Sequence, residues 1–144
     1  MSVSAPPTRT AAMVRLRYLA EAIDTASPAV RLTMLFDRLD LDLRSADAAF
    51  ASGAIKDVSD KLIHAQEIVL TLRDTLDPDS WEGAPRLAAL YDHLHGELVG
   101  ANIGKDRKRA AAAEGFLHQI GQAWRSAALQ NQQAGESAGE EAGE

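Results

Sequence analysis

The sequence predicts an all-α protein whose main part is an antiparallel up-down four-helix bundle. Apolar residues recur at steps of three and four along four stretches, Gly and Pro residues separate these stretches, and no stretch alternates like a β-strand. Alanine and leucine are abundant and aromatic residues make up only 5% of the chain, which favours helix over sheet. The 144 residues suffice for about one domain.

The first predicted helix begins at Pro28, with the Ser27 hydroxyl as its N-cap, and ends at Gly53. The second helix follows this glycine and ends before Pro78, which cannot continue a helix. Because the links are short, successive helices must run antiparallel. The predicted inward positions are Leu32, Phe36, Leu39, Leu43, Ala46 and Phe50 in the first helix, and Ile55, Val58, Leu62, Ala65, Val69, Leu72 and Leu76 in the second.

The third predicted helix begins near Gly83 and Pro85. A turn at residues 102–106 separates it from the fourth helix, which runs to about Leu129. The predicted inward positions are Leu87, Leu90, Tyr91, Leu94, Leu98 and Ala101 in the third helix, and Ala113, Phe116, Leu117, Ile120, Trp124 and Ala127 in the fourth.

The two ends of the chain differ from the bundle in composition. Residues 1–24 are predicted to form an N-terminal arm with a short amphipathic capping helix, residues 25–129 the bundle, and residues 130–144 a disordered acidic tail. The tail holds acids but no Lys or Arg, so it carries most of the net charge of -6. On composition alone, the Arg- and Ser-containing start is also similar to an organelle transit peptide.

Catalytic and metal chemistry has no support in the sequence. The chain has no cysteine, and His93 and His95 are two residues apart, so they face different sides of a helix. Glu114 and His118 form a single pair, whereas a di-iron bundle needs two Glu-x-x-His steps. No phosphate-binding loop, dinucleotide fingerprint or nucleophile elbow occurs. We therefore expect no catalytic residue, metal, cofactor or small-molecule substrate.

Nucleic acid and membrane are not expected as partners either. The densest basic run, residues 105–109, is interrupted by Asp106 and contains no aromatic residue, so we interpret it as a solvated face. No apolar run approaches the ~18–20 residues that a transmembrane helix needs.

Some apolar residues fall on faces that are predicted to point outward. Met34, Leu41 and Ala48 lie seven residues apart on the outer side of the first helix, and Ile63 and Leu70 do so on the second. Single exposed apolar residues are common in proteins, but whole rows need a cover or favour aggregation. The cover could be the N-terminal helix, a second copy of the chain in a homodimer, or a partner helix in a groove.

On the third helix, Gly96 and Gly100 are four residues apart and lower the helix surface enough to admit a close backbone. An exposed, slightly destabilised helix face is the alternative reading of these glycines.

A series of short motifs follows in a fixed order along the chain. These motifs are Tyr18, Thr25-Ala26-Ser27-Pro28, Leu35-Phe36-Asp37, Ala65-Gln66-Glu67-Ile68 with Leu72 and Leu76, Leu90-Tyr91-Asp92, Ala101-Asn102-Ile103 with Asp106, and Ala123-Trp124. In this order and spacing they resemble the flagellar secretion chaperone FliS family over about residues 18–128. Phe36 stands where the family usually has Tyr, and Arg38 where Gly is common. Because Tyr18 belongs to the matched region, the resemblance argues against a cleaved transit peptide.

The resemblance implies a bacterial cytoplasmic chaperone, without catalysis, that binds the C-terminal segment of flagellin and passes it to the flagellar export apparatus. An alternative that fits the rows is a non-catalytic scaffold that homodimerises through them. As partner-binding residues we predict Met34, Leu41, Ile63, Leu70, Tyr91, Gly96, Gly100 and Ile103, and as an N-terminal cap over the groove Met13, Leu16, Tyr18 and Leu19.

Overall fold

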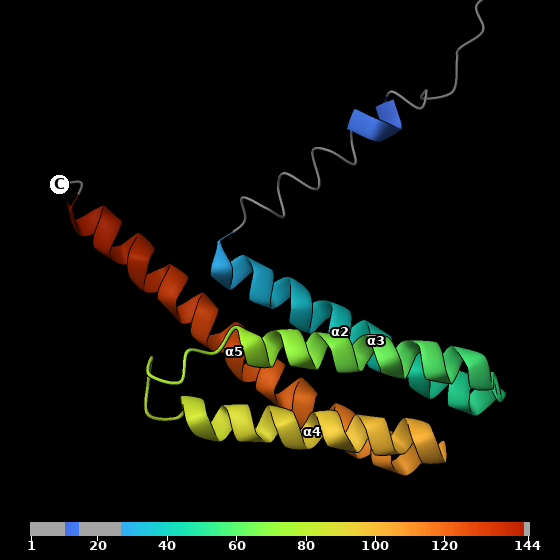
Figure 1. Ribbon diagram of the computed structural model, residues 1–144. Helices are drawn as coiled ribbons and strands as arrows, with labels where there is room; N and C mark the ends of the chain where they lie inside the picture. Colours follow the sequence, from blue (N-terminus) through green and yellow to red (C-terminus); the bar gives the residue numbers. More distant parts are fainter. Residues whose placement is uncertain (1–10, 15–26, 143–144) are drawn as a thin grey trace, which may run out of the picture. The chain divides into compact units, whose positions relative to one another are not determined.

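The computed structural model of the chain describes residues 11–14 and 27–142. Residues 11–14 form one helical turn, and four helices follow: α2 (Pro28–Ser52), α3 (Ile55–Asp74), α4 (Ala84–Gly104) and α5 (Arg107–Ala142) (Figure 1). Within these described ranges there is no strand, so the all-α prediction is confirmed. The chain divides into two units, Met1–Arg31 and Leu32–Glu144, and the second contains most of the helical structure.

The helix ends follow local signals in the sequence. The Ser27 hydroxyl accepts a hydrogen bond from the Val30 amide at 3.3 Å, and Gly53 ends the first hairpin turn with φ 72. Lys105 adopts a left-handed conformation, φ 48, at the end of α4, a position that sequence reasoning did not single out. The Asp106 carboxylate then caps α5 by accepting a hydrogen bond from the Arg109 amide at 3.1 Å.

Bonds between side chains show which helices are neighbours and how they run. On α2 and α5, the Trp124 indole donates to Thr33 at 3.0 Å, and Arg107 pairs with Asp47 at 2.8 Å near the other end of α2. As the residue numbers rise on α2 they fall on α5, so the two helices are antiparallel.

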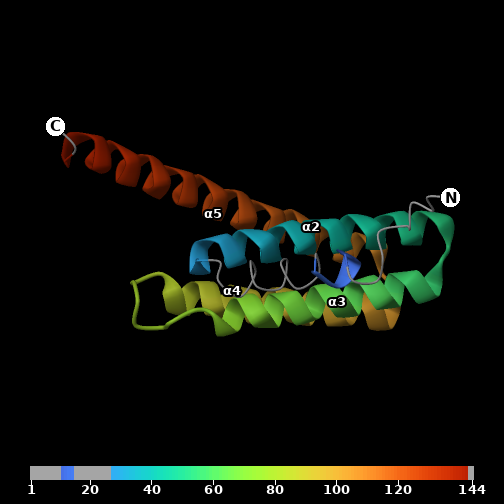
Figure 2. The same ribbon diagram turned by 90° about the horizontal axis from the view of Figure 1, so that it is seen from above.

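The same reasoning applies to α3 and α4. Arg73 pairs with Asp92 at 3.0 Å, and the Asn102 amide donates to Ser59 at 3.4 Å, so these helices are also antiparallel. The backbones approach most closely between α3 and α4 and between α4 and α5. Figures 1 and 2 show these helices lying side by side.

The core contains the leucine stripes that the sequence predicts. Leu39, Leu62 and Leu98 are 0% exposed, and α5 contributes Leu117. Three predicted inward residues are wrong: Ile55 is 52% exposed, Phe116 is 56% exposed, and Ala127 is exposed. Ile55 is the first residue of α3, and Phe116 stands about 100° around the helix from Leu117, which takes the inward position. Ala127 lies beyond Trp124, where α5 leaves the core.

The predicted disordered tail is corrected as well. Helix α5 continues from the bundle to Ala142, and residues 129–135 are exposed along its length (Figure 2). Alanine, glutamine and glutamate have high helix propensity, so the backbone keeps its hydrogen bonds in a helix although the side chains are too polar for a core.

The predicted N-terminal helix, at about residues 10–23, lies largely outside the described residues, apart from the helical turn at 11–14. Among the described helices, none combines the length and apolar character that a membrane span requires.

Two substitutions on α3 should separate core from surface. Replacing the fully buried Leu62 by Ala leaves a cavity and should lower the free energy of unfolding by about 2–5 kcal/mol. The same change at Leu70, which is 42% exposed, should cost less than about 1 kcal/mol. Urea denaturation followed by circular dichroism measures both, and equal losses would contradict this assignment of faces.

Candidate protein-binding surface

The outward apolar residues of α2 and α3 are exposed, as the sequence predicts. Met34 is 43%, Leu41 47%, Ile63 45% and Leu70 42% exposed. We call Met34, Leu41 and Ala48 the α2 row, and Ile63 and Leu70 the α3 row. Each row therefore presents apolar side chains that the core does not cover.

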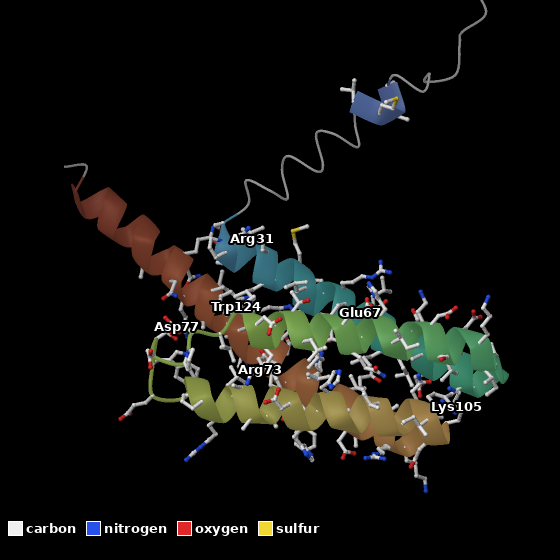
Figure 3. The ribbon with its side chains drawn as sticks, viewed as in Figure 1. Arg31, Glu67, Arg73, Asp77, Lys105 and Trp124 are labelled. Atoms are coloured by element: carbon white, nitrogen blue, oxygen red, sulfur yellow. The ribbon has the colours of Figure 1, made fainter. Side chains whose placement is uncertain are left out.

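The α3 row lies on the side of α3 that is next to α4. Ser59 lies four residues before Ile63, Leu70 seven residues after Ile63, and Arg73 three residues after Leu70, so these residues share one side of the helix. Ser59 and Arg73 bond to Asn102 and Asp92 of α4, and Figure 3 shows Arg73 between the two helices. A segment lying on this row would run along α3 beside α4.

The α2 row lies on a different side of the bundle. Thr33, Asp40 and Asp47 bond to residues of α5, whereas Met34 and Leu41 point about 100° further around α2. On that side, Asp42 contacts His64 of α3. The exposed polar side chains of Asp60, Glu67 and Thr71 on the outer face of α3 separate the two rows. A partner that covers both rows must therefore wrap around α3.

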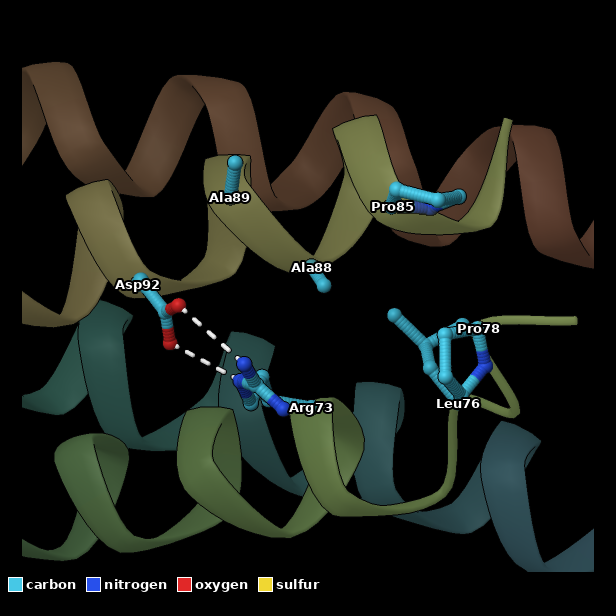
Figure 4. A pocket seen from close by; sticks show the side chains of 7 residues that line it. All are labelled: Arg73, Leu76, Pro78, Pro85, Ala88, Ala89 and Asp92. Carbon is cyan, nitrogen blue, oxygen red and sulfur yellow. Dashed lines mark hydrogen bonds and ion pairs between the residues drawn. The ribbon is translucent and has the colours of Figure 1, made fainter. Parts of the chain in front are cut away.

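A pocket of about 330 Å³ continues the α3 row at the α3–α4 corner (Figure 4). Arg73 follows Leu70 on the same side of α3. Its guanidinium donates to both oxygens of Asp92, at 3.0 and 3.4 Å, along one wall of the pocket. Sequence reasoning missed this pocket, although Pro78 of the α3–α4 connection and Pro85 in the first turn of α4 mark its other end. It is lined by Arg73, Leu76, Pro78, Pro85, Ala88, Ala89 and Asp92.

The ion pair at this pocket favours the charged form of Arg73. Hydrogen bonding to the Asp92 carboxylate raises the pKa of Arg73 above its usual value. Both side chains remain about half exposed, so a partner can approach them from solvent. The pocket is suited to an apolar side chain, with a polar wall that can also accept or donate hydrogen bonds.

The glycines predicted on α4 behave differently from each other. A side chain at Gly96 would meet nothing, so the surface is open there. At Gly100, the Arg109 guanidinium occupies the space that a Cβ would need, and it is held by Glu97 at 2.7 Å. The Arg109 side chain therefore covers the surface at Gly100, and the expectation of an open surface there is wrong. Ile103 is 82% exposed at the end of α4.

Tyr91 is buried in this structure. It is 3% exposed and belongs to the core cluster, and its contact with a partner stays a prediction. The Tyr91 ring faces the core, whereas the next residue, Asp92, faces the pocket. Burial raises the pKa of the Tyr91 hydroxyl to about 12.

The N-terminal cap falls mostly outside the described residues. Met13 lies in the helical turn at 11–14, and Leu16, Tyr18 and Leu19 lie outside the described ranges.

A second pocket, of about 270 Å³, lies between α2 and α5 and is polar. It is lined by Asp40, Arg44, Glu114 and His118. Burial, together with the nearby charges of Asp47 and Asp40, raises the pKa of Glu114. Over the described part of the chain, no three His, Asp or Glu side chains are placed to hold a metal ion.

The fold and this surface define an all-helical domain with exposed apolar rows on α2 and α3. The chain belongs to the FliS family: the family model described as "Flagellar protein FliS" matches residues 11–132.

Two curated relatives agree with this assignment, and both are named "Flagellar secretion chaperone FliS". The protein from Bacillus subtilis (strain 168) is 30% identical over 110 residues, which cover 76% of this chain and 82% of the relative. The protein from Salmonella typhimurium (strain LT2) is 31% identical over 106 residues, which cover 72% of this chain and 78% of the relative.

The raised pKa of Tyr91 predicts a loss of stability at alkaline pH. An unfolded tyrosine ionises near pH ~10, whereas folded Tyr91 keeps its proton up to about 12. Between these values the unfolded chain has lost more protons, so the free energy of unfolding falls as the pH rises, by about 1 kcal/mol at pH ~11.

Tyr91→Phe should lack this contribution. Urea denaturation of both proteins at about pH 8 and about pH 11 measures it, and the other alkaline titrations, common to both proteins, cancel in the comparison. An identical decline in the two proteins would contradict the buried, protonated hydroxyl.

Proposed function

We propose that this chain is a cytoplasmic bacterial export chaperone for flagellin. It binds the disordered C-terminal segment of flagellin, prevents premature polymerisation and delivers the segment to the flagellar type III secretion apparatus, without catalysis or a cofactor. Membership of the FliS family and the names of both relatives support this role. The exposure of the α2 and α3 rows is the observation in the structure on which the proposal depends.

The free energies of burying the exposed side chains and of ordering a partner segment indicate what kind of partner fits. Fully burying a Leu, Ile or Met side chain contributes about 1.5–3 kcal/mol, so covering the exposed half of each contributes roughly 1 kcal/mol. The four large side chains of the two rows then supply about 4 kcal/mol, which only offsets the 2–5 kcal/mol cost of ordering a disordered segment. A useful affinity therefore needs a long segment that wraps around α3 and reaches the pocket and Ile103.

The helices provide the rigid platform for such a segment. We propose that α2, α3, α4 and α5 act together as an up-down antiparallel bundle whose grooves remain fixed while the ligand folds onto them. A platform that is already ordered spends no binding energy on its own ordering.

Substitutions in the two rows should weaken binding of flagellin. Leu41→Ser and Leu70→Ser each remove apolar contact with a bound segment, so the Kd should rise about 5- to 10-fold for each. Ile55→Ser is the matched control, because Ile55 is 52% exposed but lies outside both rows. Isothermal titration calorimetry with a peptide of the last ~40 residues of flagellin, a length that grooves of this span accommodate as helix, measures the effect.

Two further measurements decide between the chaperone and the alternative, a homodimeric scaffold. The chain should retain full-length flagellin in a pull-down but not flagellin that lacks these C-terminal residues. Light scattering should show a monomer alone and a one-to-one complex with the peptide. A tight dimer that ignores the peptide would instead support the scaffold and overturn the chaperone.

The N-terminal arm is proposed as an internal cap on the apolar surface. Met13, Leu16, Tyr18 and Leu19 would rest on the groove when flagellin is missing and yield when it arrives. Deleting residues 1–23 should then tighten flagellin binding or promote self-association, as measured by calorimetry and light scattering. A truncated chain that remains monomeric and binds with unchanged affinity would contradict the cap.

A further inference from the structure

Asp42 is a charged side chain inside the apolar interior. It is 1% exposed, and among the residues that the structure describes it is the one buried polar or charged side chain. It follows Leu41 of the α2 row and lies on the side of α2 that is next to α3. A carboxylate in such a place is expected to be fully paired, because burying an unpaired charge is costly.

The pairing of Asp42 is incomplete. One oxygen, Oδ2, contacts His64 Nδ1 of α3. The other oxygen, Oδ1, lies 3.3 Å from Arg38 Nε, yet it accepts no hydrogen bond. Arg38 therefore neutralises Oδ1 by its charge but does not satisfy it as an acceptor.

Arg38 covers this oxygen from the outside. Its side chain is 51% exposed, and it stands between Met34 and Leu41 on the same side of α2. A segment that lies along the α2 row must meet the Arg38 side chain. Because this long side chain is half in solvent, it can swing into water without leaving a buried cation behind.

We propose that a segment bound along the α2 row inserts a basic side chain, Arg or Lys, that donates a hydrogen bond to Asp42 Oδ1 in place of Arg38. This inference rests on the proposed function and adds to it a charged specificity contact. The exchange keeps the charge balance, since one cation replaces another, and it supplies the hydrogen bond that Oδ1 lacks. Asp42 is thereby a specificity-determining residue, and Arg38 covers it until the basic side chain of the segment takes its place.

The test is calorimetry of the full chain with the flagellin C-terminal peptide. Asp42→Asn removes the charge at nearly the same volume and should raise the Kd about 10- to 100-fold, the range for a charge-assisted hydrogen bond. Arg38→Met keeps an apolar stem but removes the competing guanidinium, and should lower the Kd about 3- to 10-fold. Arg44→Met is the matched control on the α5 side of α2 and should leave the Kd unchanged.

Each outcome decides the inference. A folded Asp42→Asn protein with wild-type affinity would overturn it, and so would an Arg38→Met protein whose binding is unchanged or weaker. If circular dichroism shows that Asp42→Asn does not fold, the Arg38→Met result alone decides. A wild-type chain that does not bind the peptide would instead overturn the proposed function, and this is measured before any variant.

The basic donor is tested from the side of the peptide. Each Arg and Lys of the peptide is replaced in turn by Gln, and each variant peptide is titrated into wild-type and Asp42→Asn protein. One of these changes should weaken binding to the wild type about 10-fold and leave binding to Asp42→Asn unchanged, which is the signature of a direct pair. If no peptide residue couples to Asp42 in this way, the basic donor is wrong.

Discussion

Burial of one leucine stripe from each helix is the constraint on which the rest of this structure depends. Leu39, Leu62, Leu98 and Leu117 come from four different helices and are all 0% exposed. Once these positions are fixed, the direction of every other side chain follows from the 100° step of the helix. The α2 and α3 rows are exposed because the residues seven apart on the outer side cannot reach the same core.

The ion pairs around this core mainly fix how the neighbouring helices are aligned along their lengths. Arg73, Arg107, Arg109 and Arg125 each pair with a carboxylate on a neighbouring helix, and these pairs lie at the surface, where solvent screens them. Arg107 and Arg125 bond to two levels of α2 and so fix its alignment with α5. The register of the helices in turn sets where the outward rows and the pocket lie.

Each of the two rows lies next to charged groups. The α2 row surrounds Arg38, which covers the buried Asp42, and the α3 row leads to the Arg73–Asp92 pair at the pocket. Apolar contact alone distinguishes poorly between different apolar segments. A buried hydrogen-bond acceptor disfavours a segment that has no donor to pair with it.

The sequence by itself determined the helices, the start of α2 at Pro28, the leucine stripes and the outward rows, because all of these follow from local periodicity and from Ser, Gly and Pro at helix ends. It also carried the resemblance to the FliS family, which the family model confirms. Only the tertiary structure decided that Leu117 faces inward rather than Phe116, that Tyr91 is buried, and that Arg109 fills the surface at Gly100. These depend on what a neighbouring helix places opposite each residue. The same is true of the pocket and of Asp42, since a carboxylate on a helix gives no sign in the sequence of whether a second helix will cover it.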